Sequence, residues 1–174
     1  DDRRRRSRRI LAGLNIGDSR TYRLSGGALE QISVDHSVVQ ELIDSGELLA
    51  ADAAKDRRRN IITRAIGAGS TGGEADYWMI PARVGDRILV CSDGLSSEVD
   101  DDEIRTLLTV HEDPQTAADR LIDRALELGG RDNVTASSWT RCTSPRAPPA
   151  VTARSASTTR TSTPTRDRVP RPWE

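Results

Sequence analysis

The sequence has no apolar run that approaches the roughly 18 residues needed to cross a membrane. It also shows no secretory signal, because no apolar segment follows the basic residues 3–9. Only 35% of the 174 residues are hydrophobic, whereas 30% are charged. We therefore expect a cytoplasmic protein with one folded domain, in which part of the chain does not pack.

The chain has only two cysteines and two histidines, and they form no cluster of the kind that binds zinc. Cys91 lies in an apolar run and is interpreted as a small buried residue, whereas Cys142 lies in a polar segment. One disulfide is conceivable, but a reducing compartment fits better. His36 precedes a predicted helix, and His111 follows the end of one. Both are interpreted as structural residues, with a catalytic role for His36 as the alternative.

Basic residues are concentrated at the two ends of the chain. Residues 1–9 contain six arginines and two acidic residues, and residues 137–174 contain seven arginines and two acidic residues. Residues 10–136 therefore hold 13 basic and 23 acidic residues, a net charge of −10. This acidic segment argues against a nucleic-acid partner, because phosphate backbones need a basic surface. Its carboxylates are instead suited to divalent cations.

The sequence of the acidic segment predicts both strands and helices. Strands are predicted at 10–16, 21–24, 28–32, 76–81 and 86–91, and a last one begins at 133–136. Helices are predicted at 101–110 and 114–128, and another between Ser37 and Gly46. Ser37 and Gln40 have the spacing of a capping box at the start of that helix. The polar segment 49–60 is expected to be mobile or a poor helix.

The two ends of the chain are predicted to be disordered: a basic arm at 1–9 and a tail at 137–174 rich in Pro, Ser, Thr and Arg. The change at Ala136 is abrupt enough to suggest a shifted reading frame. If Ser137 and Ser138 have TCN codons, an alternative frame encodes three apolar residues and then aspartate. The excess of arginine over the single lysine, Lys55, also suits a GC-rich gene.

Three aspartates stand at the ends of predicted strands or helices: Asp18, Asp93 and Asp132. Carboxylates just past buried strands can converge on one edge of a sheet. Hard cations such as Mg²⁺ and Mn²⁺ prefer such oxygen ligands. One such aspartate alone would merely cap a turn, but three in ordered context indicate a metal site.

Four short motifs follow one another along the acidic segment: Asn15-Ile-Gly-Asp-Ser-Arg20, Asp35-His-Ser37, Ser92-Asp-Gly-Leu95 and Gly130-Arg-Asp-Asn133. Each motif alone is common. The ordered set resembles the metal-dependent serine/threonine protein phosphatases of the PPM family, type 2C class, in their bacterial form. The resemblance covers about residues 10–136 and corresponds to the C-terminal part of the family's domain.

This resemblance implies an α+β fold, a four-layer αββα sandwich of two antiparallel sheets with flanking helices, here incomplete. It implies Mn²⁺ or Mg²⁺ as cofactor, with two or three ions in a complete site. Water activated by the metals would attack phosphoserine or phosphothreonine directly, without a covalent intermediate. The partners would be phosphoprotein substrates of serine/threonine kinases, with no nucleic acid and no membrane span.

The resemblance also assigns residues. Asp93 and Asp132 would ligate one metal ion, and Asp18 with Asp93 would hold a further ion. Gly94 and Asn133 would support the ligands. No catalytic residue beyond these is identified.

Several family motifs are missing from the sequence. The family's N-terminal part carries a phosphate-binding arginine, an Asn-Glu-Asp motif and an Asp-Gly-x-Gly-Gly motif whose aspartate bridges two metals. Without the bridging carboxylate, the chain alone is predicted to be inactive and poorly stable. The segment 49–60 corresponds to the flap that shapes substrate access in the family.

The sequence leaves two alternatives to this function. A degenerate, non-catalytic phosphatase domain would bind phosphoproteins or regulate a partner. The segment 67–72 matches the G-x-G-x-x-G pattern of dinucleotide-binding proteins. That pattern requires a helix directly after it, whereas residues 73–78 are predicted to form a loop and then a strand. Nucleotide binding is therefore disfavoured.

Overall fold

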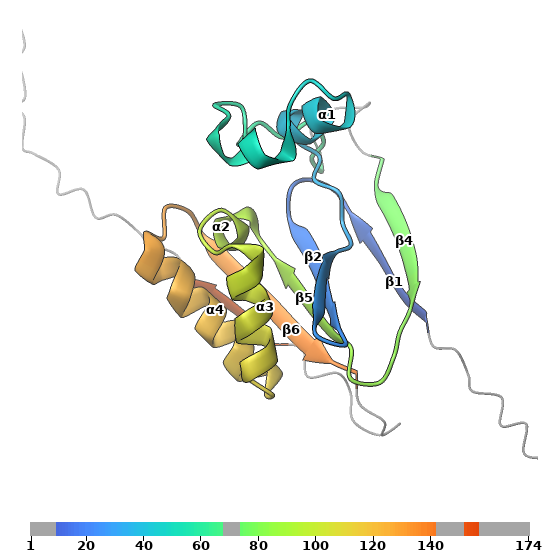
Figure 1. The fold of residues 1–174 in the computed structure, drawn as a ribbon, viewed down its shortest axis with the longest axis vertical. Helices are drawn as coiled ribbons and strands as arrows, with labels where there is room; N and C mark the ends of the chain where they lie inside the picture. The colour runs from blue at the N-terminus through green and yellow to red at the C-terminus, as the bar shows by residue number, and fades with distance from the viewer. Residues whose placement is uncertain (1–9, 68–73, 142–151, 157–174) are drawn as a thin grey trace, which may run out of the picture.

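The computed structural model describes residues 10–67, 74–141 and 152–156, which form two antiparallel sheets and several helices (Figure 1). This confirms the predicted α+β class. The elements run in the order β1 (Ile10–Asn15), β2 (Arg20–Ser25), β3 (Ala28–Gln31), α1 (Val38–Asp44), the 3-10 helix η1 (Ala50–Lys55), β4 (Asp76–Pro81), β5 (Arg87–Cys91), α2 (Asp93–Ser96), α3 (Asp101–Val110), α4 (Pro114–Leu128), β6 (Val134–Thr140) and β7 (Thr152–Ala156).

Several predictions fall outside the described residues. These are the disordered arm 1–9, most of the glycine-rich loop, Cys142, and the tail at 142–151 and 157–174. None of the helices in the described part of the chain has the length and apolar composition that crossing a bilayer requires.

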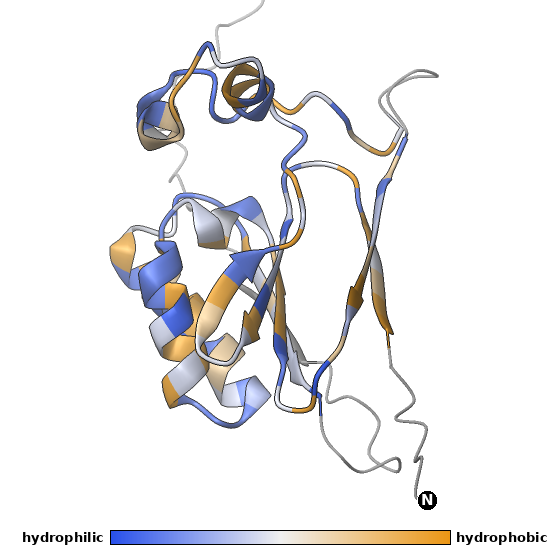
Figure 2. Cartoon of the chain, turned by 45° about the vertical axis from the view of Figure 1, so that its right-hand side comes forward, coloured by the Kyte–Doolittle hydropathy of each residue, from blue (hydrophilic) through white to orange (hydrophobic). Residues whose placement is uncertain are grey.

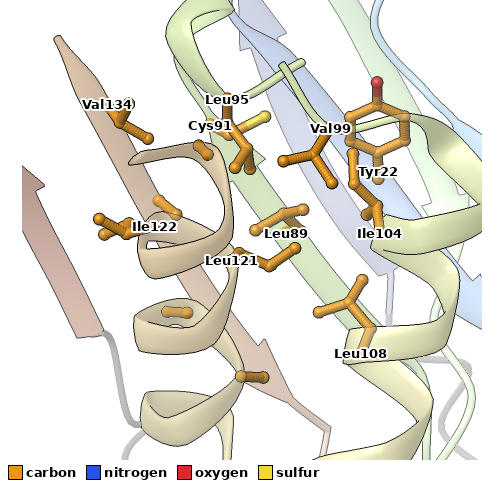
Figure 3. Close-up of a cluster of buried hydrophobic side chains, with 14 of the residues drawn as sticks. Tyr22, Leu89, Cys91, Leu95, Val99, Ile104, Leu108, Leu121, Ile122 and Val134 are labelled. Atoms are coloured by element: carbon orange, nitrogen blue, oxygen red, sulfur yellow. The ribbon is translucent and has the colours of Figure 1, made fainter. Parts of the chain in front are cut away.

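The larger sheet has the strand order β3-β2-β5-β6-β7, with β5 in its centre. Helices α3 and α4 lie against one face of this sheet (Figure 1). Side chains from α2 to α4 gather there over Leu89 and Cys91 of β5, as Figure 3 shows. They are the buried residues Leu95, Ile104, Leu108 and Leu121, with Val99 from the turn between α2 and α3. This apolar layer is the main core, because burial of apolar surface is the dominant stabilising term in folding.

Local signals in the sequence set the ends of the two long helices. Asp100 accepts a hydrogen bond from the Glu103 N–H, and Asp113 accepts one from the Thr116 N–H, so each helix begins at an aspartate cap. Helix α4 ends at Gly129, whose φ of 145° suits glycine. An apolar stripe on α4 faces the sheet, where Ala117, Leu121, Ile122 and Ala125 are buried, whereas Leu128 at the end of the same stripe is 40% exposed.

The capping box predicted at α1 is only half formed. Ser37 caps the helix by accepting from the Gln40 N–H at 3.2 Å. The Gln40 side chain does not return the bond and instead donates to Asp44. In the flap segment, residues 50–55 form the 3-10 helix η1.

In the described contacts, carbonyls at the end of α3 are bound by Arg87 rather than by the side chain of His111, the histidine that follows this helix. The buried guanidinium of Arg87 donates to the carbonyls of Leu108, His111 and Glu112. Burial lowers the pKa of Arg87 from its usual value. A residue of the central strand thus satisfies carbonyls that the helix itself leaves open.

The smaller sheet consists of β1 and β4 and has one apolar face toward solvent. Its inner positions are partly buried, and the Trp78 indole packs directly over Gly13. Its outer positions include Leu14, Tyr77 and Met79, which are 61%, 79% and 75% exposed. Hydrophobic positions recur along both strands in Figure 2. Among the described elements, none covers this outer face as α3 and α4 cover the larger sheet.

The prediction that the last strand ends at Ala136 is wrong. Strand β6 continues to Thr140 and pairs with β5 along this length, with Ser138 opposite Leu89. Part of the predicted disordered tail forms β7, which pairs with β6. The prediction failed because a strand's backbone hydrogen bonds depend on its neighbours, whereas composition reports only on side chains.

The serines of β6 lie in an environment that suits apolar residues. Ser138 is fully buried, and the hydroxyls of Ser137 and Ser138 have no hydrogen-bond partner among the described residues. A buried polar group without a partner is destabilising. The shifted-frame hypothesis stays a prediction, but apolar residues at these positions are what it requires.

We predict that Ser138→Ala raises the free energy of unfolding by about 1–2 kcal/mol, because it removes an unpaired buried hydroxyl. The matched control is Ser33→Ala. Ser33 is also buried, but its hydroxyl accepts from the Thr21 N–H at 2.9 Å. The control variant is expected to be less stable than the parent by about 1–3 kcal/mol. Urea unfolding measures both, and equal destabilisation by the two variants would contradict the prediction.

Candidate metal centre

The three predicted ligands lie at the ends of three paired strands. Cys91, the last residue of β5, lies opposite Arg20 of β2 and Ala136 of β6. Because both pairings are antiparallel, the starts of β2 and β6 lie beside the end of β5. The aspartates are each two residues from these strand ends: Asp18 before β2, Asp93 after β5 and Asp132 before β6.

Asp18 lies in a turn between β1 and β2 that is fixed by backbone contacts. The turn requires a glycine at position 17, where φ is 100°. The buried Asn15 side chain donates to the carbonyls of Gly17 and Val34 at 3.1 and 3.3 Å. Asp18 is therefore held half-buried at the edge of the sheet.

Asp93 occupies the first position of α2, directly after the buried strand β5. Its carboxylate accepts from the Gly94 N–H at 2.9 Å. The preceding residue ties this turn to β6, because the Ser92 hydroxyl donates to the carbonyl of Asn133 and accepts from the Thr135 N–H, both at 3.1 Å. The orientation of Asp93 thus depends on two neighbouring strands.

A close backbone approach brings the loop of Asp132 against α2. A Cβ atom at Gly94 would lie 2.3 Å from the Asn133 carbonyl oxygen, too close for any side chain. The sequence predicted supporting roles for Gly94 and Asn133. Those roles stay predictions, and what the geometry requires is that position 94 has no side chain beside the Asn133 carbonyl.

Asp18 and Asp93 line the same small open cleft, whose volume is about 60 Å³. Asp132 does not line it, but its charge acts on Asp93. Burial raises the pKa of Asp93, and the charges of Asp18 and Asp132 raise it further. The structure therefore brings all three aspartates into electrostatic contact and places two of them in one cleft.

The remaining walls of the cleft come from segments far apart in the sequence. They are Arg20, Asp35, Ser37, Arg59, Asn60, Ser96 and Ser97. Arg20 and Asp35 form an ion pair at 2.7 Å and so neutralise each other. The sequence placed both residues in motifs but assigned neither a role. The spacing of their motifs gave no signal that they would pair.

The donor set fits a hard divalent cation only in part. In the described part of the chain, neither Asp18 nor Asp93 forms an ion pair. Unneutralised carboxylates in a cleft are suitable ligands for Mn²⁺ or Mg²⁺, which complete their shells with water. However, the described residues contain no group of three His, Cys, Asp or Glu side chains placed to hold an ion together. Further oxygen ligands are needed for a complete site.

We predict that Asp93→Asn stabilises the metal-free chain at neutral pH. Because the pKa of Asp93 is raised in the folded state, the folded chain binds the proton more tightly than the unfolded chain. The charged carboxylate therefore opposes folding, and the parent loses stability as pH rises from the usual aspartate range. Asparagine removes this charge and keeps an acceptor for the Gly94 N–H.

Thermal unfolding in EDTA at several pH values measures this effect. The advantage of the variant should be full at neutral pH and disappear below the usual aspartate pKa. The control is Asp123→Asn on the exposed side of α4, which should change little. A variant less stable than the parent at neutral pH would contradict the prediction.

The chain is similar to known proteins both in sequence and in structure. No family model matches the chain. A serine/threonine phosphatase, stp, of Listeria welshimeri is 39% identical over 121 residues, which are 70% of this chain and 48% of that protein. The phosphatase PstP of Mycobacterium tuberculosis is 44% identical over 127 residues, 72% of this chain and 24% of PstP.

The fold agrees with these relatives. The crystal structure of the M. tuberculosis phosphatase PstP/Ppp matches with a TM-score of 0.69 at 42% identity, over 73% of this chain and 53% of the other. A structure of the PstP catalytic domain in complex with two manganese ions matches with a TM-score of 0.64 at 42% identity, over 73% of this chain and 51% of that chain. The chain spans about half the length of the Listeria relative it matches. Over about 70% of its own length, it is similar to bacterial serine/threonine phosphatases, among them a putative type 2C phosphatase of Streptococcus pyogenes and the PPM phosphatase MsPP of Mycobacterium smegmatis.

Proposed function

We propose that this chain carries one side of the active site of a metal-dependent phosphatase that hydrolyses phosphoserine and phosphothreonine in proteins. The observation that carries the proposal is the shared cleft of Asp18 and Asp93, with Asp132 close enough to act on Asp93. The names of the relatives, which are serine/threonine phosphatases, support the substrate class. The substrates would be products of serine/threonine kinases, and the setting would be cytoplasmic.

The cofactor would be Mn²⁺ or Mg²⁺. Asp18 and Asp93 would hold one ion in the cleft, and Asp132 would share a second ion with Asp93. The raised pKa of Asp93 supports this assignment, because a cation placed there would remove the repulsion between the three carboxylates. Manganese is supported by the PstP complex with two manganese ions.

A bound divalent cation would lower the pKa of a bound water molecule and neutralise negative charge on a phosphoryl group. The residues of the chain would orient and hold the reactants. Gly94 allows the segments that carry Asp93 and Asp132 to approach each other closely. Arg20 and Asp35 neutralise each other and so add no net charge to the cleft. Arg59 lines the cleft and forms no ion pair with the described residues, so it is available to a substrate anion.

The complete site would need ligands beyond those described here. The described residues provide two carboxylates in the cleft, and the chain spans about half of the Listeria relative. The isolated chain is therefore expected to be inactive. A non-catalytic module that binds phosphoproteins is the competing function, and the same shortage of ligands favours it.

A chimera separates these functions. We predict that PstP, with its matching segment replaced by that of this chain, releases phosphate from a phosphothreonine peptide in a Mn²⁺-dependent reaction. Asp93→Asn in the chimera should lower the rate at least about 100-fold, because it removes a ligand. Asp123→Asn in the same chimera is the matched control and should leave the rate unchanged.

The 174-residue chain alone should show no Mn²⁺-dependent hydrolysis of p-nitrophenyl phosphate above background. A chimera that is folded by circular dichroism and binds the phosphopeptide but does not hydrolyse it would favour the non-catalytic module. It would contradict the catalytic proposal.

A further inference from the structure

His36 holds both polar backbone groups of the residue that precedes Asp18. Its imidazole is 4% exposed. The ring Nδ1 accepts from the Gly17 N–H at 3.1 Å, and the backbone N–H of His36 donates to the Gly17 carbonyl at 2.9 Å. The turn that carries Asp18 is therefore clamped from one side by a single residue that is 19 positions further along the chain.

The contacts of the other ring nitrogen define the tautomer. The Gly17 N–H can only donate, so Nδ1 must be the unprotonated nitrogen of a neutral ring and Nε2 must carry the proton. Nε2 lies 3.1 Å from the carboxylate of Asp76 in β4, which accepts a hydrogen bond from the Nε2–H group. The Nη1 of Arg64 lies 3.3 Å from Nε2, but two N–H groups cannot bond to each other.

Arg64 instead neutralises the carboxylate that fixes this tautomer. Its Nη1 donates to the second oxygen of Asp76 at 3.0 Å. The hydrogen bonds from His36 and Arg64 hold the pKa of Asp76 below its usual range. Asp76 thus stays charged and keeps the proton of His36 on Nε2, away from Gly17.

His36 also joins the Asp18 turn to the segment that leaves the flap. Its carbonyl accepts from the Thr63 N–H at 2.8 Å, and Ser37 forms a β-bridge with Ile62. Gly17 itself lies close to this segment, because a Cβ there would be 3.8 Å from the Arg64 carbonyl. One buried histidine therefore connects β4, the flap exit and the turn of a proposed metal ligand.

We propose that His36 is a positioning residue for the metal centre, which acts through Gly17 to hold Asp18 toward the cleft, with Asp76 locking the required tautomer. The proposal rests on the proposed metal-binding role of Asp18. Residues that orient a metal ligand from outside the coordination shell contribute about 10-fold to 100-fold in metal affinity. An effect of this size is expected for His36.

Two substitutions of His36 separate its contact with Gly17 from its contact with Asp76. His36→Asn places an amide oxygen near the position of Nδ1, so it can accept from Gly17 but cannot reach Asp76. His36→Gln places its amide near Nε2, so it can reach Asp76 but leaves Gly17 without an acceptor. His36→Asn loses the partly buried hydrogen bond to Asp76, and His36→Gln loses the buried one from Gly17. A purely structural role would lower Mn²⁺ affinity in each variant only in proportion to its loss of stability.

The measurement is Mn²⁺ affinity of the full chain by electron paramagnetic resonance, with thermal unfolding in parallel. His36→Asn should keep most of the parent's affinity, and His36→Gln should weaken it about 10-fold or more. His111→Gln, at the only other histidine, is the control and should match the parent. Nitrogen NMR of the metal-free chain should show the proton of His36 on Nε2, with slow exchange of the Gly17 amide.

The outcomes separate this proposal from the one it rests on. If the parent binds Mn²⁺ and the Asn and Gln variants weaken binding equally, or only in proportion to their losses of stability, the positioning role is overturned and the metal site stands. A proton on Nδ1 would also overturn the positioning role. If the parent chain binds no Mn²⁺ at all, both proposals fall.

Discussion

The pairing of β5 with both β2 and β6 is the constraint on which the candidate site depends. It places the end of one buried strand beside the starts of two others, with Cys91 opposite both Arg20 and Ala136. Burial disfavours the charged form of Asp93 and raises its pKa, and the nearby charges of Asp18 and Asp132 raise that pKa further. The apolar layer between the sheet and α3 and α4 supplies the stability that opposes this electrostatic cost.

The convergence of the aspartates could be predicted because β5 is an unbroken apolar run with a sharp end at Ser92. The caps of α3 and α4 could be predicted for a similar reason, since aspartate and proline act within one helical turn. The end of β6 could not be predicted, because Ser137 and Ser138 carry no strand signal and their place in the sheet comes from β5 and β7. A structural role for His36 was predicted, but its contacts were not. Its partners Gly17 and Asp76 are 19 and 40 positions away, and nothing in the local sequence indicates these contacts.

The outer face of the sheet formed by β1 and β4 is not covered by another element in the described part of the chain. Tyr77 and Met79 are mostly exposed, although large apolar residues on one face of a strand usually pack against another layer. The chain spans about half of the Listeria relative, and the described residues contain no group of three His, Cys, Asp or Glu side chains placed to hold an ion. The relative contains about as much polypeptide again that this chain does not match, and a segment of that kind would both cover such a face and supply further ligands. Within the described residues, Gly94 lets the segment of Asp93 lie against Asn133, and His36 holds the turn of Asp18 through Gly17.

The most direct test of this account is where a paramagnetic cation binds first. Nitrogen-labelled full chain is titrated with small amounts of Mn²⁺, and the broadening of each amide resonance is followed. The account predicts that the amides of 17–19 and 93–94 broaden together, before the exposed acidic start of α3 at 101–103. Broadening that begins at 101–103, or that spreads evenly over all acidic residues, would contradict a shared site of Asp18 and Asp93.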